Sequence, residues 1–306
     1  MKIKLFNKKF RTPWKNKIHR PKPETIILSV MFVIAFIYAL TLLFPFVWVG
    51  YTSLRTNVMF DEFILNKYAL PTDVIAGLQN YKNVFTMTNS NGIGFIEMLI
   101  NSIEYSFVLT AVSIWFPTSV AYVMRQYRFK LRGLYMGIII FNMTVPIVGG
   151  TASMMKLLGD LNLLNDTYLG IYLFGMGGFG GTTFIVMSFF ANMEFAYAES
   201  AFMDGASHWK VFVKIYLPMA IPIMVTIGVL AFIGYWNDYT NIFLYADQKP
   251  NLAFGVIEMR SYLENEVGDF PASYAFMMLS ILPGFILFLC FQKTILKNFN
   301  MGGLKG

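Results

Sequence analysis

The sequence is short of charge, cysteine and histidine, and each shortage excludes a class of protein. Charged residues make up 13% of its 306 residues, about half the share found in a soluble domain. A single cysteine, Cys290, excludes an internal disulfide framework. The two histidines, His19 and His208, lie far apart, so we expect no zinc or haem site. The chain is therefore not expected to be a soluble, disulfide-rich or metal-dependent protein.

A nucleotide-binding loop is also missing from the sequence. No segment matches G-x-x-x-x-G-K-[ST], the pattern whose backbone and lysine hold phosphates. The run "GMGGFGGT" at 175–182 has no lysine and lies inside an apolar stretch. We interpret this run as small residues that let helices pack closely. Any process that this chain carries out with ATP must therefore use a nucleotide site on another chain.

Long apolar runs dominate the sequence instead, since 56% of its residues are hydrophobic. A run of about 20 apolar residues is long enough to cross a bilayer as a helix. We predict an all-α membrane protein with six transmembrane helices, at about 25–52, 97–123, 133–157, 167–192, 218–245 and 272–293.

The basic residues give these spans an orientation. The net charge is +7, and nine of the 24 lysines and arginines precede Pro23. If the N-terminus is inside, the inner segments and Lys293 hold 18 of the 24 lysines and arginines. Cytoplasmic loops of membrane proteins are enriched in these residues in the same way. We therefore place both termini in the cytoplasm. We expect the basic arm at 1–24 to interact with lipid headgroups and not with nucleic acid. This arm either lies on the membrane surface through Phe10 and Trp14 or is a disordered topology signal.

One inner segment, 196–217, is more polar than the spans on either side of it. Its sequence predicts a helix over Ala196–Asp204, which Gly205 can end in a left-handed conformation. Ser207 can cap a second helix, and Pro218 suits the first turn of the next span. The alternative is an ordinary amphipathic linker on the membrane surface. The second helix would carry near one face Trp209, Phe212, Val213 and Tyr216.

The spacing within this segment resembles the EAA motif of the membrane subunits of binding-protein-dependent ABC importers. All fixed positions agree except Ser200, where the family usually has alanine. Other stretches, among them "LLNDTYLGIYL" and "WNDY", resemble the carbohydrate-uptake branch and its maltose-type, MalG-like subunit. The resemblance covers roughly residues 97–306. The motif positions, with Asp204 beside the glycine, are Glu199, Ser200, Ala201, Gly205, Ile215, Leu217 and Pro218.

This resemblance implies a fold, a function and a set of partners. The fold is the type I transmembrane domain of ABC importers, with 25–306 as the permease domain and 196–217 as a cytoplasmic coupling helix. The function is to form half of the pathway for an oligosaccharide or related glycoside, without catalysing a reaction. The partners are a second homologous permease, two cytoplasmic ATPase subunits that hold ATP and Mg, and an extracellular solute-binding protein, all at a bacterial cell membrane. Glu199 would pair with a basic residue of the ATPase.

Polar and aromatic residues inside the predicted spans are candidates for the solute pathway. Charges within spans are costly and often mark a pathway, and Glu104 and Asp238 qualify. Asp238 lies among aromatic and amide groups, which stack on sugar rings and bond sugar hydroxyls. The alternatives are an interfacial aromatic belt around Asp238, and a pairing of Glu104 with Asn101 or a partner subunit. The full candidate set is Glu104, Asn142, Trp236, Asn237, Asp238 and Tyr239.

The third span carries a polar stripe from Asn142 to Ser153. Pro146 and the pair Gly149-Gly150 fall within this stripe and predict a kink or a break. A break is common where a pathway is lined, and the alternative is close helix packing through small residues.

Three other functions fit the same residues. A permease for a polyol phosphate such as glycerol phosphate would resemble this chain, although the few lysines and arginines in the spans favour a neutral solute. An ion-coupled secondary transporter would use Glu104 and Asp238, and a symmetric pair of broken helices would be its signature. A membrane scaffold would use 196–217 for docking alone.

Overall fold

The computed structural model describes residues 22–58, 60, 74–89, 91–145, 149–164 and 166–299. Within these ranges every regular element is a helix, and the one strand-like feature is a single bridge between Thr88 and Gly94. The predicted all-α class is therefore confirmed. The chain consists of two compact units, residues 1–48 and residues 49–306.

The first unit contains most of α1 (Lys22–Ser53), which continues into the second unit. From Thr25 onward this helix is apolar for 29 residues, which at 1.5 Å per residue is about 43 Å and enough to cross a bilayer. The predicted span 25–52 is confirmed as a helix. The predicted basic arm, 1–24, lies almost entirely outside the described residues.

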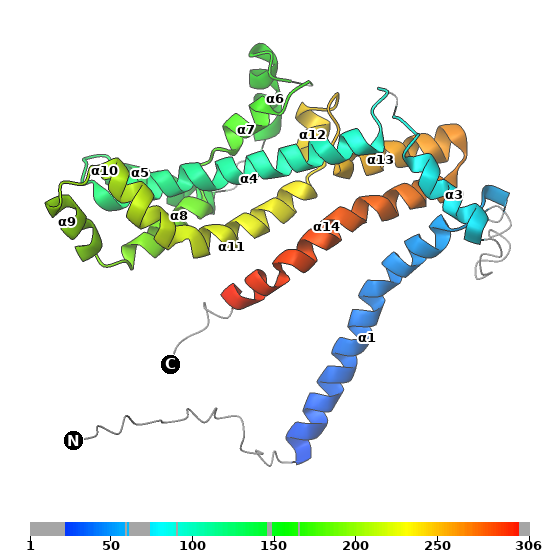
Figure 1. The fold of residues 1–306 in the computed structure, drawn as a ribbon, viewed down its shortest axis with the longest axis horizontal. Coiled ribbons are helices and arrows are strands. Elements are labelled where there is room, and N and C mark those ends of the chain that lie inside the picture. The colour runs from blue at the N-terminus through cyan, green and yellow to red at the C-terminus, as the bar shows by residue number, and fades with distance from the viewer. Residues whose placement is uncertain are drawn as a thin grey trace, which may run out of the picture. The chain divides into compact units, whose positions relative to one another are not determined.

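Three long helices form the frame of the second unit (Figure 1). The central helix, α4 (Phe95–Gln126), packs along α11 (Leu217–Trp236), and α11 contacts α14 (Phe270–Phe299). Each contains a continuous stretch that is long and apolar enough to span a membrane. The predicted spans 97–123 and 272–293 therefore correspond to α4 and α14.

The fifth predicted span, 218–245, begins earlier in the structure than the sequence suggested. The short helix α10 (His208–Val211) and a π-helical turn (Phe212–Tyr216) run into α11 without a break. The π-helical turn closes with a bond from the N–H of Leu217 to the carbonyl of Phe212. The second half of the segment that resembles the EAA motif, from His208 onward, is therefore joined to α11 as one continuous helix.

The same span also ends earlier than predicted, because α11 stops at Trp236. The side chain of Asp238 accepts the backbone N–H of Asn241 at 3.1 Å, which supports the start of a separate helix, α12 (Thr240–Tyr245). The apolar residues of α12 had extended the hydrophobic pattern beyond the true end of the helix. Asp238 consequently lies in a turn between helices, and its predicted position inside a span is wrong.

The third and fourth predicted spans, 133–157 and 167–192, are each divided into two shorter helices. A continuous helix of either length would have crossed the membrane, but no piece of them reaches 18 residues. Among the described residues, four helices are long and apolar enough to span a membrane. The pieces of the divided spans are α5 (Arg132–Thr144), α6 (Gly150–Asp160), α7 (Leu169–Gly175) and α8 (Gly181–Ala191).

The two breaks have different origins. In the third span Gly149, which immediately precedes α6, has φ of +82°, so the predicted break is confirmed, while Pro146 lies outside the described residues. In the fourth span Gly177 and Gly178 have φ of +67° and +104°, a conformation that favours glycine. The glycine run was interpreted as a packing surface, but its centre ends the helix.

Side chains of α5 satisfy the backbone at the second break. The hydroxyl of Tyr135 donates to the carbonyl of Gly178 at 2.7 Å. The amide of Asn142 donates to the carbonyl of Phe179 at 3.0 Å. A broken helix inside a membrane requires such partners, because lipid offers no hydrogen bonds. The polar side chains of α5 are therefore explained, at least at these two positions, by the backbone beside them.

Shorter helices lie at both ends of α4, while α6 and α7 lie beside its middle (Figure 1). Where α4 begins, it lies beside α3 (Val74–Val84) and α13 (Leu252–Tyr262), which continues into a π-helical turn. Where α4 ends, it lies beside α10 and α9 (Ala196–Met203). The candidate coupling segment and the loops of the opposite end are therefore separated by the length of α4.

Candidate functional site

The segment 196–217, here called the motif segment, has the predicted helix–turn–helix geometry. The first helix is α9, and it is followed by Gly205 with φ of +77°. The Ser207 side chain accepts the N–H of Lys210 at 3.4 Å and caps α10. The predicted helix boundary, glycine turn and serine cap are all confirmed. They were predictable because each depends on residues within a few positions.

The motif positions divide into an exposed half and a packed half. In the first half Glu199, Ser200, Asp204 and Gly205 are exposed, while Ala201 is partly buried. Ser200 bonds the carbonyl of Ala196 in its own helix, so the departure from alanine is accommodated locally. In the second half, Ile215 and Leu217 are partly buried, and Pro218 is exposed.

Glu199 makes no ion pair within the part of the chain that the structure describes. Two large apolar side chains of the same segment are also open, since Met203 is 88% exposed and Trp209 is 65% exposed. Trp209 was predicted near the same face as Phe212 and Tyr216, but those two are buried while Trp209 is open, and its ring contacts only Phe212, at 5.8 Å, among the described aromatic neighbours. An unpaired carboxylate beside open apolar groups is suited to contact another protein.

The opposite face of the motif segment is buried against the core. Tyr122 of α4 contacts the rings of Phe212 and Tyr216 at centroid distances of 4.8 and 5.0 Å. The buried cluster joins α4, α8, α9, α10 and α11, and its members are Ala121, Tyr122, Val186, Phe190, Ala198, Val211, Phe212, Tyr216 and Ala220. A force applied to the motif segment is therefore passed to several helices at once.

Asp238 is held by hydrogen bonds from three places in the chain. Its carboxylate accepts the hydroxyl of the buried Tyr105 at 2.7 Å and the side-chain amide of Asn241 at 2.6 Å. Asn251 donates to its backbone carbonyl at 3.0 Å. These bonds connect α4 to the turn before α12 and to the start of α13. The contacts favour a packing role for Asp238 over a solute contact or an exposed aromatic belt.

Glu104 forms an ion pair that the sequence did not indicate. Its carboxylate lies 2.7 Å from the ammonium group of Lys249, in the loop between α12 and α13. Lys249 also lies 4.5 Å from the ring centre of Tyr168, whose hydroxyl donates to the Lys249 carbonyl at 2.6 Å. The predicted partner, Asn101, instead donates to the carbonyl of Pro250 at 3.0 Å.

We expect Glu104→Lys to lower both thermal stability and transport, because it places two ammonium groups together. The double change Glu104→Lys with Lys249→Glu should restore both, since each side chain is the charged partner of the other. An exposed pair of this kind contributes about 0.2–1 kcal/mol, so thermal unfolding of the purified protein should resolve only a small shift. If the double variant is stable but does not transport, the Glu104–Lys249 pair contacts the solute and is not merely structural.

The other candidate residues do not meet at one site. The amide of Asn142 donates to the carbonyl of Phe179, between α7 and α8. The amide of Asn237 donates to the carbonyl of Ile233 in α11 at 2.8 Å. Tyr239 is 49% exposed in the turn after α11. Trp236 is buried and stacks on Phe232 with ring centres 6.0 Å apart. Glu104 and Asp238 are linked only indirectly among the described residues, since Asp238 accepts a hydrogen bond from Tyr105, the residue that follows Glu104 on α4.

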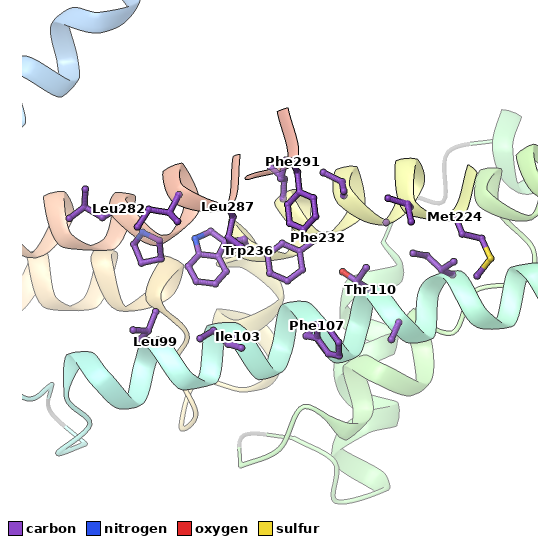
Figure 2. Close-up of a pocket in the computed structure, with 18 of the residues that line it drawn as sticks. Leu99, Ile103, Phe107, Thr110, Met224, Phe232, Trp236, Leu282, Leu287 and Phe291 are labelled. Carbon is purple, nitrogen blue, oxygen red and sulfur yellow. The ribbon is translucent and has the colours of Figure 1, made fainter. Parts of the chain in front are cut away.

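Trp236 belongs to a groove of about 1280 Å³ between α4, α11 and α14. Figure 2 shows Leu99, Ile103, Phe232 and Trp236 around this groove. Its walls are almost entirely apolar, with the hydroxyl of Thr110 as a rare polar group. A sugar binds through hydroxyl groups that need polar partners, so this groove is suited to hydrocarbon and not to a sugar.

Comparisons with known proteins agree with this geometry. The family described as binding-protein-dependent transport system inner membrane component matches residues 113–300. The maltose/maltodextrin permease protein MalG of Photorhabdus laumondii is 27% identical over 217 residues, covering 68% of this chain and 72% of its own. The sulfoquinovosyl glycerol permease protein SmoH of Agrobacterium fabrum is 26% identical and covers 90% and 93%. A crystal structure of a bacterial ABC transporter that imports alginate superposes with a TM-score of 0.70 at 23% identity, covering 90% of this chain and 98% of that one.

Proposed function

Because the chain belongs to the family of inner membrane components of binding-protein-dependent transport systems, we propose that it is one permease subunit of an ATP-driven importer. It forms half of a pathway for an oligosaccharide or a related glycoside. In this proposal both termini and the motif segment face the cytoplasm of a bacterial cell. The bias of lysine and arginine toward the inner segments supports this orientation.

The observation that carries the proposal is the geometry of the motif segment. It presents a carboxylate with no ion pair among the described residues, a left-handed glycine and two open apolar side chains, while its other face is fixed to the core. A cytoplasmic ATPase subunit that closes on ATP would displace this segment, and the helices fixed to it would follow as a rigid body. Glu199 would meet a basic residue of that subunit.

The proposed assembly contains a second homologous permease, two ATPase subunits and an extracellular solute-binding protein. ATP and Mg belong to the ATPase subunits, so this chain needs no cofactor of its own. The family description itself names dependence on a binding protein. The absence of a phosphate-binding loop from the sequence supports a nucleotide site on a separate chain.

A neutral sugar is favoured as the solute. Relatives are named for the uptake of diacetylchitobiose, galactooligosaccharides and maltodextrin, and two basic residues, Lys249 and Arg260, already pair with Glu104 and Glu264. An anionic solute is the second candidate, because SmoH is named for a sulfonated sugar and a further relative for glycerol phosphate. Competition between maltotriose and glycerol phosphate for the binding protein of the system would separate the two classes.

Ion coupling receives less support from the contacts. The chain does contain two divided spans, which the sequence had not suggested for 167–192. However, both carboxylates that would carry the ion already have partners, since Glu104 pairs with Lys249 and Asp238 accepts Tyr105 and Asn241. The family match independently favours an importer powered by an ATPase.

We expect Glu199→Lys to abolish copurification of the ATPase subunit, because it reverses the charge offered to a basic partner. Affinity purification of the tagged chain from its native membrane, followed by mass spectrometry, measures the copurified ATPase. The matched control is Glu194→Lys, which reverses an exposed carboxylate five positions earlier and outside the motif. Equal loss in both variants, or undiminished ATPase with Glu199→Lys, would argue against docking through the motif.

A further inference from the structure

We propose that Tyr122 and Arg125, in the last turns of α4, are positioning residues that fix the motif segment to α4. A displacement of this segment then moves α4 together with α11, and not α11 alone. This inference rests on the proposed function, since it needs an ATPase that displaces the segment. It adds a second route for the movement, beside the continuous helix from α10 into α11.

Tyr122 holds the end of the turn that follows α9. Its hydroxyl donates to the backbone carbonyl of His208 at 3.0 Å, and its ring is enclosed by Phe212 and Tyr216. That carbonyl belongs to the first residue of α10 and also accepts the N–H of Phe212. A carbonyl has two lone pairs, so both bonds can form at once. The hydroxyl of Tyr122 therefore attaches α4 directly to the backbone of α10.

Arg125 holds the other end of the segment. Its Nη2 donates to the carbonyl of Met193 at 3.3 Å, in the turn before α9. Its guanidinium group lies 5.7 Å from the ring centre of Phe195, a distance at which cation–π attraction acts. The Nε of Arg125 is buried without a hydrogen-bond partner among the described residues. The guanidinium group of this partly buried arginine is held by its contacts at Nη2 and at the ring.

The two residues lie three positions apart on α4 and so project from one face of the helix. Between them they hold the chain before α9, at Met193, and after it, at His208. A short helix fixed at both ends to the same neighbour moves with that neighbour. The far end of α4 carries Tyr105, about 26 Å from Tyr122 at 1.5 Å per residue, where it bonds Asp238. Movement of the motif segment would therefore reach the outer loops through α4.

The test measures the separation between α4 and α9 in the assembled importer. Nitroxide labels are attached at Phe116→Cys on α4 and Tyr197→Cys on α9, both of which are exposed, in a Cys290→Ser background. Distance distributions are recorded by pulsed electron paramagnetic resonance without nucleotide and after trapping with Mg-ATP and vanadate. With Tyr122 and Arg125 intact, we expect the maximum and the width of the distribution to stay the same on trapping.

The variant Tyr122→Phe with Arg125→Gln should lose this rigidity, and its distribution should shift or broaden on trapping. Arg125→Lys keeps the positive charge but lacks the planar guanidinium group, so this variant should show a smaller change of the distance distribution on trapping. Tyr127→Phe is the matched control, because the Tyr127 ring contacts His208 at 5.0 Å while no hydrogen bond of its hydroxyl is found among the described residues. Quantification of the copurified ATPase verifies that each complex has assembled.

Two results would overturn the inference. One is a change of separation on trapping in the unmodified chain, and the other is a double variant that behaves like the unmodified chain. If the double variant does not assemble, Tyr122→Phe alone decides, since it removes one oxygen atom and leaves the ring packing. Failure of the unmodified chain to copurify with any ATPase would refute the proposed function itself, and is distinguishable from both.

Discussion

Gly205→Trp is expected to abolish ATP-driven transport while the chain still inserts and folds. Gly205 has φ of +77° and connects α9 to the cap of α10. A left-handed conformation costs an ordinary residue roughly 1–2 kcal/mol. A Cβ atom added there would meet no atom of the chain within 4 Å. The indole would therefore project into the space that the ATPase must occupy, and copurified ATPase should fall by tenfold or more, on the order of 1.4 kcal/mol of binding.

Gly92→Trp separates the effect of backbone strain from the effect on docking. Gly92 has φ of +80° and is also free of atoms within 4 Å, but it lies in the loop before α4 at the opposite end of the unit. Both variants carry the same conformational cost, so they should lose similar amounts of thermal stability. Only the Gly205 variant should lose its ATPase. Undiminished transport by Gly205→Trp would count against a docked coupling helix.

Asp238→Ala is expected to lower the free energy of unfolding by about 3 kcal/mol. The change removes the acceptor of two side-chain hydrogen bonds and one backbone bond, and it leaves the buried hydroxyl of Tyr105 without its partner. Each unsatisfied buried polar group costs about 1–3 kcal/mol. Thermal or denaturant unfolding of the purified protein in a fixed detergent measures this loss.

Asn237→Ala is the control for this second experiment. Its side chain donates to Ile233 of the preceding helix, α11, and makes no other hydrogen bond in the part of the chain that the structure describes. Replacing it should change the free energy of unfolding by about 0.5 kcal/mol or less. The double variant with Tyr105→Phe should be no less stable than Asp238→Ala alone, since the shared bond is already lost. A fully stable Asp238→Ala protein that no longer transports would return this carboxylate to the solute pathway.

Features that depend on neighbouring residues could be predicted from the sequence. The glycine turn, the serine cap of α10 and the boundaries of α9 follow from a few adjacent positions, and the structure confirms each of them. The long apolar runs likewise predicted α1, α4 and α14, because a continuous hydrophobic stretch has few alternatives in a membrane.

Features that depend on distant residues could not be predicted in this way. Glu104 and Lys249 lie 145 positions apart, and Tyr105 and Asp238 lie 133 apart, so no local pattern reveals either pair. The end of α11 was missed for the same reason. Hydropathy continues through α12, and the structure there is set by hydrogen bonds to Asp238 from α4 and from the turn itself.

The division of the fourth span shows a different limit. Small residues in a span indicate either close packing or a break, and composition alone does not separate the two. Gly175 does allow α7 to approach α4, because a Cβ atom there would lie 2.2 Å from Leu109. Two positions later the same run ends the helix, and Tyr135 and Asn142 make that end possible. Partners from another helix decided between the two outcomes.

The π-helical turn at Phe212–Tyr216 sets the angular phase between α10 and α11. A π turn holds one residue more than an α turn, and one residue corresponds to about 100° of rotation around a helix axis. A relative that lacks this residue would keep both helices and their lengths, yet would present a different side of α10 to its ATPase. A one-residue gap at this place in an alignment therefore indicates that a different face of α10 contacts the ATPase. A permease with the extra residue and one without it are not expected to function with each other's ATPase.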